Sequence, residues 1–302
     1  RLSPDGSLAD LKLKHFTRYD LNLAPMKTED QMNLLYKILI VNNDRNNTLA
    51  SIVQKSGGYP LYLEQMAYYL LEKCKNTCDN QLLNPSREIC SFSISDIFNS
   101  RLDGFSQEMR ECVYHAAILG FQFDVKLLEL ILKKNIRQHL ITGVNHRLWV
   151  ATNQNRYFFT HALIRDMVYE RLLHENLREL HKRTADALLE FYGDAFTAHT
   201  SEIAYHFEKA DCLPEAAVHY FGASRFHMKM SNWQTGLIMQ KKATLLSGIH
   251  YGFGSAEHIE NLFWMAIDFH YIQHFAKAEH LYNIVFNNRM EALGEDDPMM
   301  SP

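Results

Sequence analysis

Apolar side chains recur along most of the chain at intervals of three and four residues, with polar side chains between them. This spacing is typical of one face of an α-helix. It predicts helices over residues 32–40, 48–53, 60–73, 93–102, 109–119, 125–133, 136–144, 161–173, 175–192 and 199–210. Two short apolar runs, 148–152 and 156–159, flank the polar turn Asn153-Gln154-Asn155 and predict a β-hairpin. We therefore expect a mainly α fold with one small hairpin.

Several helix ends carry residues that start or stop helices. Thr28-Glu29-Asp30-Gln31 has the Thr-x-x-Gln form of a capping box, and Asp124 precedes a helical pattern as an N-cap. Gly57 and Gly58 end one helix, and Pro60 fixes the first turn of the next. Gly120 ends the helix over 109–119. Before these helices, Phe16–Leu23 alternates in a way that predicts a short strand.

The segment Tyr157–Leu173 (YFFTHALIRDMVYERLL) changes from strand to helix within a few residues. Its aromatic run predicts a strand, and Leu163, Met167 and Leu172 predict a helix that Thr160 caps. His161 then falls in the first helical turn, where unpaired N–H groups and the helix dipole favour an anion such as phosphate. The alternative is that His161 only helps to cap the helix.

Small and aromatic residues repeat near the C-terminal end. The sets Ala216/Tyr220/Ala223, Gly236/Gln240/Ala243 and Ala278/Tyr282/Val285 share one spacing, and Trp233 and Phe275 each precede a set by three residues. This pattern resembles degenerate tetratricopeptide-like helix pairs with a unit longer than the common one. Simple helix-on-helix packing is the alternative.

Composition narrows the class of protein. The chain has 302 residues, 47% hydrophobic and 22% charged, which suggests two or three domains, and its net charge of −4 argues against general coating of nucleic acid. It contains no apolar stretch long enough to predict a membrane span or a leader, and because it begins with Arg1 we expect a piece of a longer protein. The five cysteines are irregularly spaced, and Cys74-x3-Cys78 has no second pair, so we expect a reducing, cytoplasmic compartment without zinc.

Two motifs, in order, resemble a known family. FFTHALIRDMVYERL resembles the end of the winged-helix domain in signal transduction ATPases with numerous domains (STAND), the class of NLR receptors and MalT-like regulators. SGGYPLYLEQM resembles the GNPLFLEEL-type motif in the helical lid of the same class, with Tyr59 in place of the usual asparagine. Thr160 and Ala162 replace the neighbours of the histidine in the Met-His-Asp motif.

The resemblance implies a domain order and a ligand. Residues 1–27 match the end of the nucleotide-binding core, 28–92 the helical lid and linker, 93–173 the winged-helix domain and 174–302 the tetratricopeptide-like repeats. It implies that Gly58 and Pro60 lie at the adenine side of bound ADP or ATP and that His161 contacts the β-phosphate, with Mg in the longer protein. It also implies an attached effector, such as a class III nucleotidyl cyclase, a kinase or a LuxR-type regulator.

The chain contains no G-x-x-x-x-G-K-[ST] phosphate loop and no catalytic motif, so we expect no enzyme activity and no held cofactor in this chain alone. The expected function is regulatory: closing over a nucleotide bound mainly elsewhere, and relaying that state to an effector, to other domains and to protein partners on the repeats. A nucleotide-independent scaffold is one alternative. A lesser one is DNA binding by the winged helix through Lys134, Arg137 and Arg147.

Overall fold

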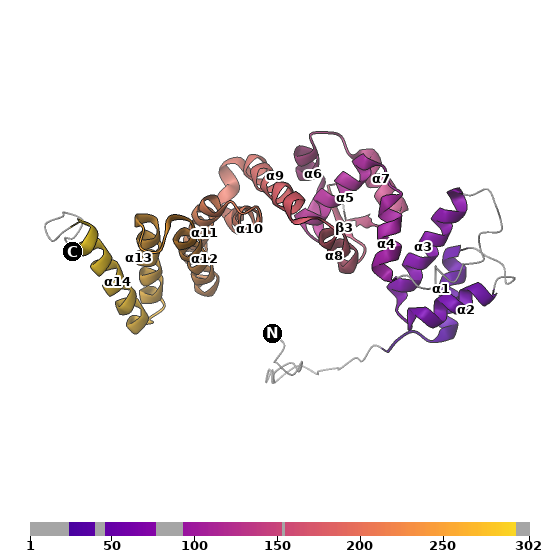
Figure 1. Ribbon diagram of the computed structural model, residues 1–302, viewed down its shortest axis with the longest axis horizontal. Coiled ribbons are helices and arrows are strands. Elements are labelled where there is room, and N and C mark those ends of the chain that lie inside the picture. Colours follow the sequence, from indigo (N-terminus) through magenta and orange to yellow (C-terminus); the bar gives the residue numbers. More distant parts are fainter. Residues whose placement is uncertain (1–23, 40–45, 77–92, 153–154, 294–302) are drawn as a thin grey trace. The chain divides into compact units, whose positions relative to one another are not determined.

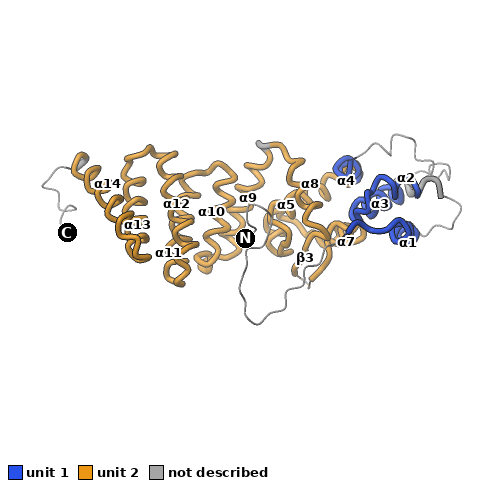
Figure 2. The backbone as a smooth tube through the Cα atoms, turned by 90° about the horizontal axis from the view of Figure 1, so that it is seen from below, with its two compact units in different colours: residues 1–101 blue, residues 102–302 orange. Residues whose placement is uncertain are grey.

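The computed structural model describes residues 24–39, 46–76, 93–152 and 155–293, and it divides into two compact units, residues 1–101 and 102–302 (Figure 2). The fold is mainly α-helical with one small antiparallel sheet, which confirms the predicted fold class (Figure 1). The predicted strand Phe16–Leu23, the linker 77–92 and the end of the chain lie outside the described residues.

Unit 1 is a small helical cluster. Its helices are α1 (Thr28–Leu39), α2 (Asn46–Ser56), α3 (Pro60–Asn76) and most of α4 (Ile94–Asp103). Leu35, Ile52, Leu63 and Ile97 are almost fully buried in one apolar core to which all four helices contribute. Because Ile97 belongs to this core, α4 completes the packing of α3 on its neighbours.

The predicted capping box at the start of α1 is not formed. The Lys27 carbonyl accepts the first helical hydrogen bond, from Gln31 N at 3.0 Å, so Thr28 lies inside the helix. The buried Gln31 side chain instead donates to Met26 O at 2.7 Å and accepts from the Ser56 hydroxyl at 2.6 Å. Gln31 therefore joins α1 to the end of α2, a long-range role that local spacing could not reveal.

Unit 2 begins with a group of helices and the small antiparallel sheet, in the region where a winged helix is predicted. The elements of this region are α5 (Gln107–Leu119), β1 (Gln122–Asp124), α6 (Val125–Leu132), α7 (Arg137–Asn145), β2 (Trp149–Ala151), β3 (Arg156–Phe159) and α8 (Ala162–Glu170). The strand order is β1-β3-β2, antiparallel throughout, with Trp149 opposite Phe159 and Phe123 opposite Tyr157. The hairpin of β2 and β3 is confirmed, whereas β1 was not predicted.

The core of this domain forms around Trp149. Its ring is fully buried, and its Nε1 donates to Leu140 O at 3.1 Å. Gly143 on α7 makes room for it, because a Cβ there would lie 2.1 Å from the indole ring. As predicted, Asp124 caps α6, accepting from Lys126 N at 2.8 Å, and Gly120, with φ +125°, follows α5.

The rest of unit 2 is a succession of helices, each packed mainly on the one before and the one after (Figure 1). They are α9 (His174–Tyr192), η4 (Gly193–His199), α10 (Thr200–Lys209), α11 (Leu213–Lys229), α12 (Trp233–Tyr251), α13 (Ala256–Tyr271) and α14 (Phe275–Leu293). Trp233 and Phe275 are the first residues of α12 and α14, and Ala216, Gly236 and Ala278 are buried at the equivalent repeat positions. No helix of the described ranges is long and apolar enough to cross a membrane.

Three turns in this array have the same backbone form. Asp211, Ser231 and Gln273 each adopt a positive φ between 59° and 63°. The next residue donates back to the carbonyl five positions earlier, as in the bond from Asn232 N to His227 O at 2.9 Å. This is the Schellman turn, in which glycine usually occupies the left-handed position. Here the left-handed position is never a glycine.

Candidate functional site

The predicted adenine-side residues lie in the turn between α2 and α3. Gly58 is buried with φ +82°, and a Cβ there would lie 2.6 Å from Pro25 Cβ and 2.9 Å from Met26 N. Met26 N donates to Gly58 O at 3.0 Å. Gly58 therefore lets the segment before α1 pass directly over the turn, while Pro60 is the exposed first residue of α3.

His161 is the N-cap residue of α8. The sequence predicted Thr160 as the N-cap and placed His161 inside the first helical turn. The His161 backbone is extended, its carbonyl accepts from Ile164 N at 3.1 Å, and its imidazole makes no capping hydrogen bond. The hydroxyl of Thr160, the predicted cap, instead donates a hydrogen bond to Arg147 O at 2.7 Å. Leu163, from which the helix was predicted, is 46% exposed, whereas Ile164 and Met167 are buried.

Gly58 and Pro60 belong to unit 1, whereas His161 belongs to unit 2. Each is described within its own unit. Binding of ADP or ATP by these three residues stays a prediction.

The residues of the DNA-binding alternative differ in their surroundings. Lys134 Nζ pairs with Glu111 Oε2 at 2.8 Å, which neutralises its charge. Arg137 is exposed at the start of α7, and Arg147 has φ +55° in the turn before β2. α7 itself exposes Ile141 and Val144, side chains that suit a protein surface better than a DNA groove.

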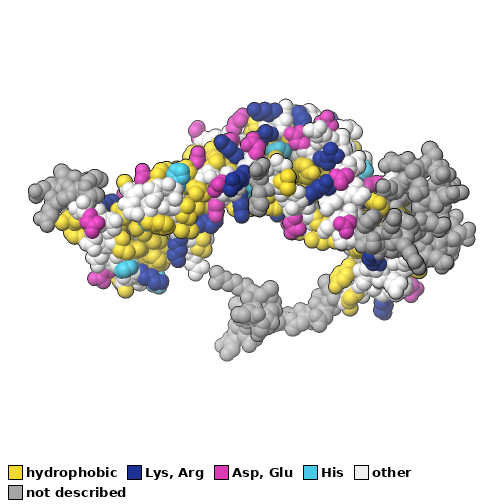
Figure 3. All heavy atoms as spheres, in the orientation of Figure 1, with side chains coloured by type: hydrophobic (Ala, Val, Ile, Leu, Met, Phe, Trp, Pro, Cys, Tyr) yellow, Lys and Arg dark blue, Asp and Glu magenta, His cyan; other side chains and the backbone are white. Residues whose placement is uncertain are grey.

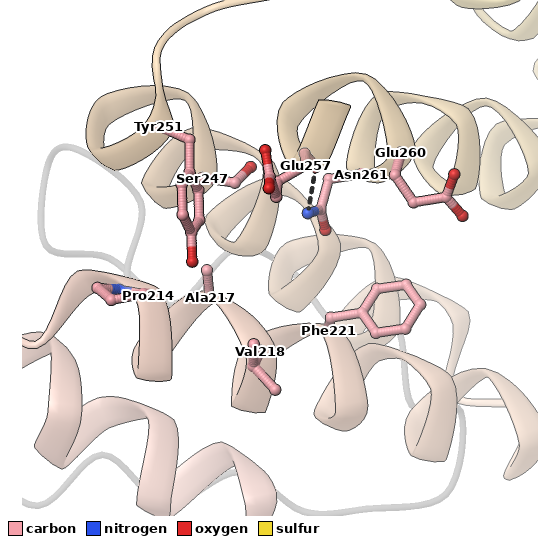
Figure 4. A pocket seen from close by; sticks show the side chains of 9 residues that line it. All are labelled: Pro214, Ala217, Val218, Phe221, Ser247, Tyr251, Glu257, Glu260 and Asn261. Carbon is pink, nitrogen blue, oxygen red and sulfur yellow. Dashed lines mark hydrogen bonds between the residues drawn. The ribbon is translucent and has the colours of Figure 1, made fainter. Parts of the chain in front are cut away.

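A groove between α11 and α13 is a concave feature of unit 2. Its first part is a hollow of about 220 Å³ between α11, the end of α12 and the start of α13, with Val218 and Phe221 on one wall and Glu257 and Asn261 on the other (Figure 4). A second hollow of about 660 Å³ shares Phe221 with the first. It is lined by Phe221, Arg225, Met228, Lys229, Trp233, Trp264, Ile267, Asp268 and Tyr271.

The floor of the second hollow holds an arginine–carboxylate pair. Arg225 Nη2 donates to Asp268 Oδ2 at 2.5 Å and to Gln240 Oε1 at 3.2 Å. The Asp268 side chain is only 1% exposed, and burial raises the pKa of its carboxyl above the usual value although the Arg225 charge lowers it. Asp268 Oδ1 and Arg225 Nε have no hydrogen-bond partner among the described residues. The pair is therefore only partly satisfied.

Aromatic rings surround this pair. The Arg225 guanidinium lies 4.8 Å from the centroid of the Trp264 ring and 5.4 Å from that of Phe221. The Trp233 and Tyr271 rings are parallel within 11°, with centroids 6.4 Å apart, and they are 41% and 69% exposed. Hydrophobic side chains gather over these C-terminal helices in Figure 3. The groove thus combines exposed aromatic walls with a polar floor.

A second polar cluster joins α8 to α9 and α10. His181 Nδ1 and His206 Nδ1 lie 2.8 Å apart, and Tyr169 Oη lies 3.0 Å from His181 Nε2. Burial lowers the pKa of His181 to about 4 and that of His206 to about 3, so both rings are neutral at pH 7. His206 is therefore a buried packing residue, and no group of three or more side chains that could hold a metal ion occurs in the ranges that the structure describes.

Sequence patterns missed Arg225 and Asp268. They lie 43 positions apart on different helices, so no local spacing connects them. The available signal was a carboxylate inside the apolar run Phe263–Phe269 (FWMAIDF), where a charge needs a partner.

Comparisons with known proteins find a sequence relative and a similar solved structure. No protein-family model matches the chain. An uncharacterized protein of Rhizobium meliloti (strain 1021) is 27% identical over 179 residues, which cover 56% of this chain and 17% of that protein. A crystal structure of a signal transduction ATPase with numerous domains that has a tetratricopeptide repeat sensor, from Pyrococcus horikoshii, aligns with a TM-score of 0.42 and 12% identity over 89% of this chain and 42% of that one. The chain spans less than half the length of either protein.

Proposed function

We propose that this chain is the regulatory and protein-binding part of a multidomain signalling ATPase. The observation that carries the proposal is the open groove of α11 and α13, in an array of helices that pack mainly on their sequence neighbours. An exposed, largely apolar groove in a helical array is suited to binding another protein. The motifs around Pro60 and His161 support the nucleotide-dependent part of the proposal.

In this proposal the longer protein binds ADP or ATP mainly through a phosphate loop that is not part of this chain. Gly58 and Pro60 close over the adenine, and His161 donates to the β-phosphate in the ADP-bound state only. A contact made in one state shifts the equilibrium by its free energy, so these residues couple nucleotide state to the effector. The β-phosphate of ADP would supply the negative charge to which the His161 imidazole donates.

The first test is His161→Ala in the longer protein. A hydrogen bond to an ionised phosphate contributes about 1.5–3 kcal/mol, so we expect ADP affinity to fall tenfold or more and basal effector activity to rise. His250→Ala, at an exposed position on α12, is the control and should change neither. Unchanged ADP affinity together with a lower melting temperature would make His161 a structural cap only.

The second test is hydrolysis by this chain alone. Because it lacks a phosphate loop, we expect no ATP turnover and weak nucleotide binding at most. Steady turnover by purified chain, retained after a further chromatographic step that removes contaminating ATPases, would contradict the proposal.

A further inference from the structure

We propose that the groove along α11 and α13 binds a peptide segment of a partner protein that carries a basic side chain next to large apolar ones. This inference rests on the protein-binding part of the proposed function and names the chemistry of the partner.

The length of the groove favours a peptide over a small molecule. Its lining on α11 runs from Pro214 to Lys229, and on α13 from Glu257 to Tyr271. At 1.5 Å per helical residue this is roughly 20 Å, the reach of about six extended residues or of a four-turn helix. The two hollows meet at Phe221, so one segment can occupy both.

The charges at the first hollow select a basic side chain. Both ionisable acids that line it, Glu257 and Glu260, are exposed, and no Lys or Arg lines it. Glu260 is already engaged, since it accepts from Trp264 Nε1 at 2.8 Å and lies 3.2 Å from Arg289 Nη2. The Glu257 carboxylate has no partner among the described residues, so it is the acid that a Lys or Arg of the partner would meet.

The second hollow selects large apolar side chains. Trp233, Trp264 and Tyr271 present aromatic surface to it. The Arg225 guanidinium packs on the Trp264 and Phe221 rings by cation–π contacts. Aromatic rings lose little freedom on binding and often dominate the energy of an interface. The unpartnered Oδ1 of the buried Asp268 adds an acceptor at the floor, which a donor on the segment could satisfy after a small side-chain rotation.

The test is a selection of peptides on the full 302-residue chain. A display library of random 15-residue peptides is selected for binding, and enriched peptides are measured by fluorescence anisotropy. We expect enriched peptides to carry Lys or Arg beside Trp, Phe, Leu or Ile, and their affinity to fall as salt rises.

Four variants then locate the binding site. Glu257→Lys and Tyr271→Ala, both at exposed groove positions, should each weaken binding tenfold or more. Glu279→Lys and Phe286→Ala, exposed on α14 outside the groove lining, are matched controls and should stay within twofold of wild type. Circular dichroism spectra of all four should match the wild-type spectrum, since none removes a buried group.

Three results would overturn the inference. One is a selection that yields no binder, and another is a set of binders that lack basic residues or respond equally to groove and control variants. The third is self-association in sedimentation that Tyr271→Ala abolishes, which would make a second copy of the chain the occupant. None of these depends on nucleotide, so the inference and the ADP-dependent role can fail separately.

Discussion

Each of the two units contains an arginine–carboxylate pair in which one partner is almost fully buried, and the two pairs differ in how completely they are hydrogen-bonded. In unit 1, Arg101 of α4 is 4% exposed; its Nε and Nη2 donate to Glu72 at 3.1 and 2.9 Å, and its Nη1 donates to Gln65. In unit 2, Arg225 makes one contact to Asp268, and an oxygen of that carboxylate is left without a partner among the described residues. The closed pair fastens α4 to α3, whereas the open pair borders a groove.

The difference shows what a buried ion pair is worth in each place. Taking both charges out of water costs several kcal/mol, and only good geometry with further hydrogen bonds offsets that cost. The Arg101 pair has that geometry and is a structural tie. The Arg225 pair lacks such further hydrogen bonds at Asp268 Oδ1, and it lines the groove that is proposed to bind a partner.

Removing the closed pair should have the largest effect. Arg101→Leu removes the buried guanidinium that donates to Glu72 and Gln65, and we expect a loss of about 3–5 kcal/mol in the free energy of unfolding. Urea titration followed by circular dichroism measures it. Arg183→Leu, which breaks the exposed i,i+4 pair with Glu179, is the control and should cost about 0.5 kcal/mol or less. If both variants lost the same unfolding free energy, the buried Arg101 pair would be no more stabilising than an exposed surface pair.

The histidine pair should give the next largest effect, through pH. The pKa values of His181 and His206 are lowered to about 4 and about 3, so the unfolded chain takes up protons first as the pH falls below 6.5. The stability that the two neutral rings contribute is therefore fully present well above pH 6.5 and is lost progressively as the pH drops from there toward 4. Unfolding free energies at pH 7, 5.5 and 4.5 check this. The slope should be shallower in His206→Gln and unchanged in His250→Gln.

Two glycines, Gly58 in unit 1 and Gly222 in unit 2, differ in backbone conformation and in the space available for a Cβ. Gly58 has φ +82° and no room for a Cβ, so Gly58→Ala should cost about 2 kcal/mol or more. A Cβ at Gly222, inside α11, would meet only Thr200 Cγ2 at 3.6 Å, and Gly222→Ala should stabilise by about 0.5–1 kcal/mol. Thermal melting of both variants decides the matter: opposite signs are expected, and a destabilised Gly222→Ala would mean that the array packs more tightly than described.

Neutralising the open pair should have the smallest effect. Asp268→Asn keeps an oxygen for Arg225 and removes a buried charge whose pKa is raised, so we expect a change below about 1 kcal/mol at pH 7. A carboxyl with a raised folded pKa costs stability above that pKa and recovers it as the pH falls. The difference between variant and wild type should therefore diminish toward acid pH. A loss as large as that of Arg101→Leu would make Asp268 a structural tie as well.

Local patterns in the sequence predicted much of the fold. Asp124, Gly120 and Pro60 begin or end helices where expected, because each acts through the backbone of its own few residues. The hairpin was found because two apolar runs flank a polar turn. β1 was missed because Gln122-Phe123-Asp124 is too short to show alternation and is fixed only by pairing with β3.

The features that sequence could not supply are long-range. Thr160 has the side chain of a helix cap, yet its hydroxyl bonds to Arg147 and Leu148, which shifts the start of α8 to the position after His161. The groove depends on Arg225 and Asp268, which meet only after α11 and α13 are placed. A role that depends on a contact between distant helices cannot be predicted from the spacing of residues along the chain.

The Schellman turns at Asp211, Ser231 and Gln273 bear on how the array folds. Each closes within six residues, and each helix of the array packs mainly on its sequence neighbours, so most contacts form between residues close in the chain. Chains with such low contact order fold quickly, because little loop entropy is lost before contacts form. At each of these three turns a residue with a side chain adopts the left-handed backbone conformation, which adds a small local strain. Glycine at these three positions would raise the stability of the turns without changing the residues that line the groove. In refolding experiments, we expect the array to form early, as a series of helix pairs that nucleate independently and join.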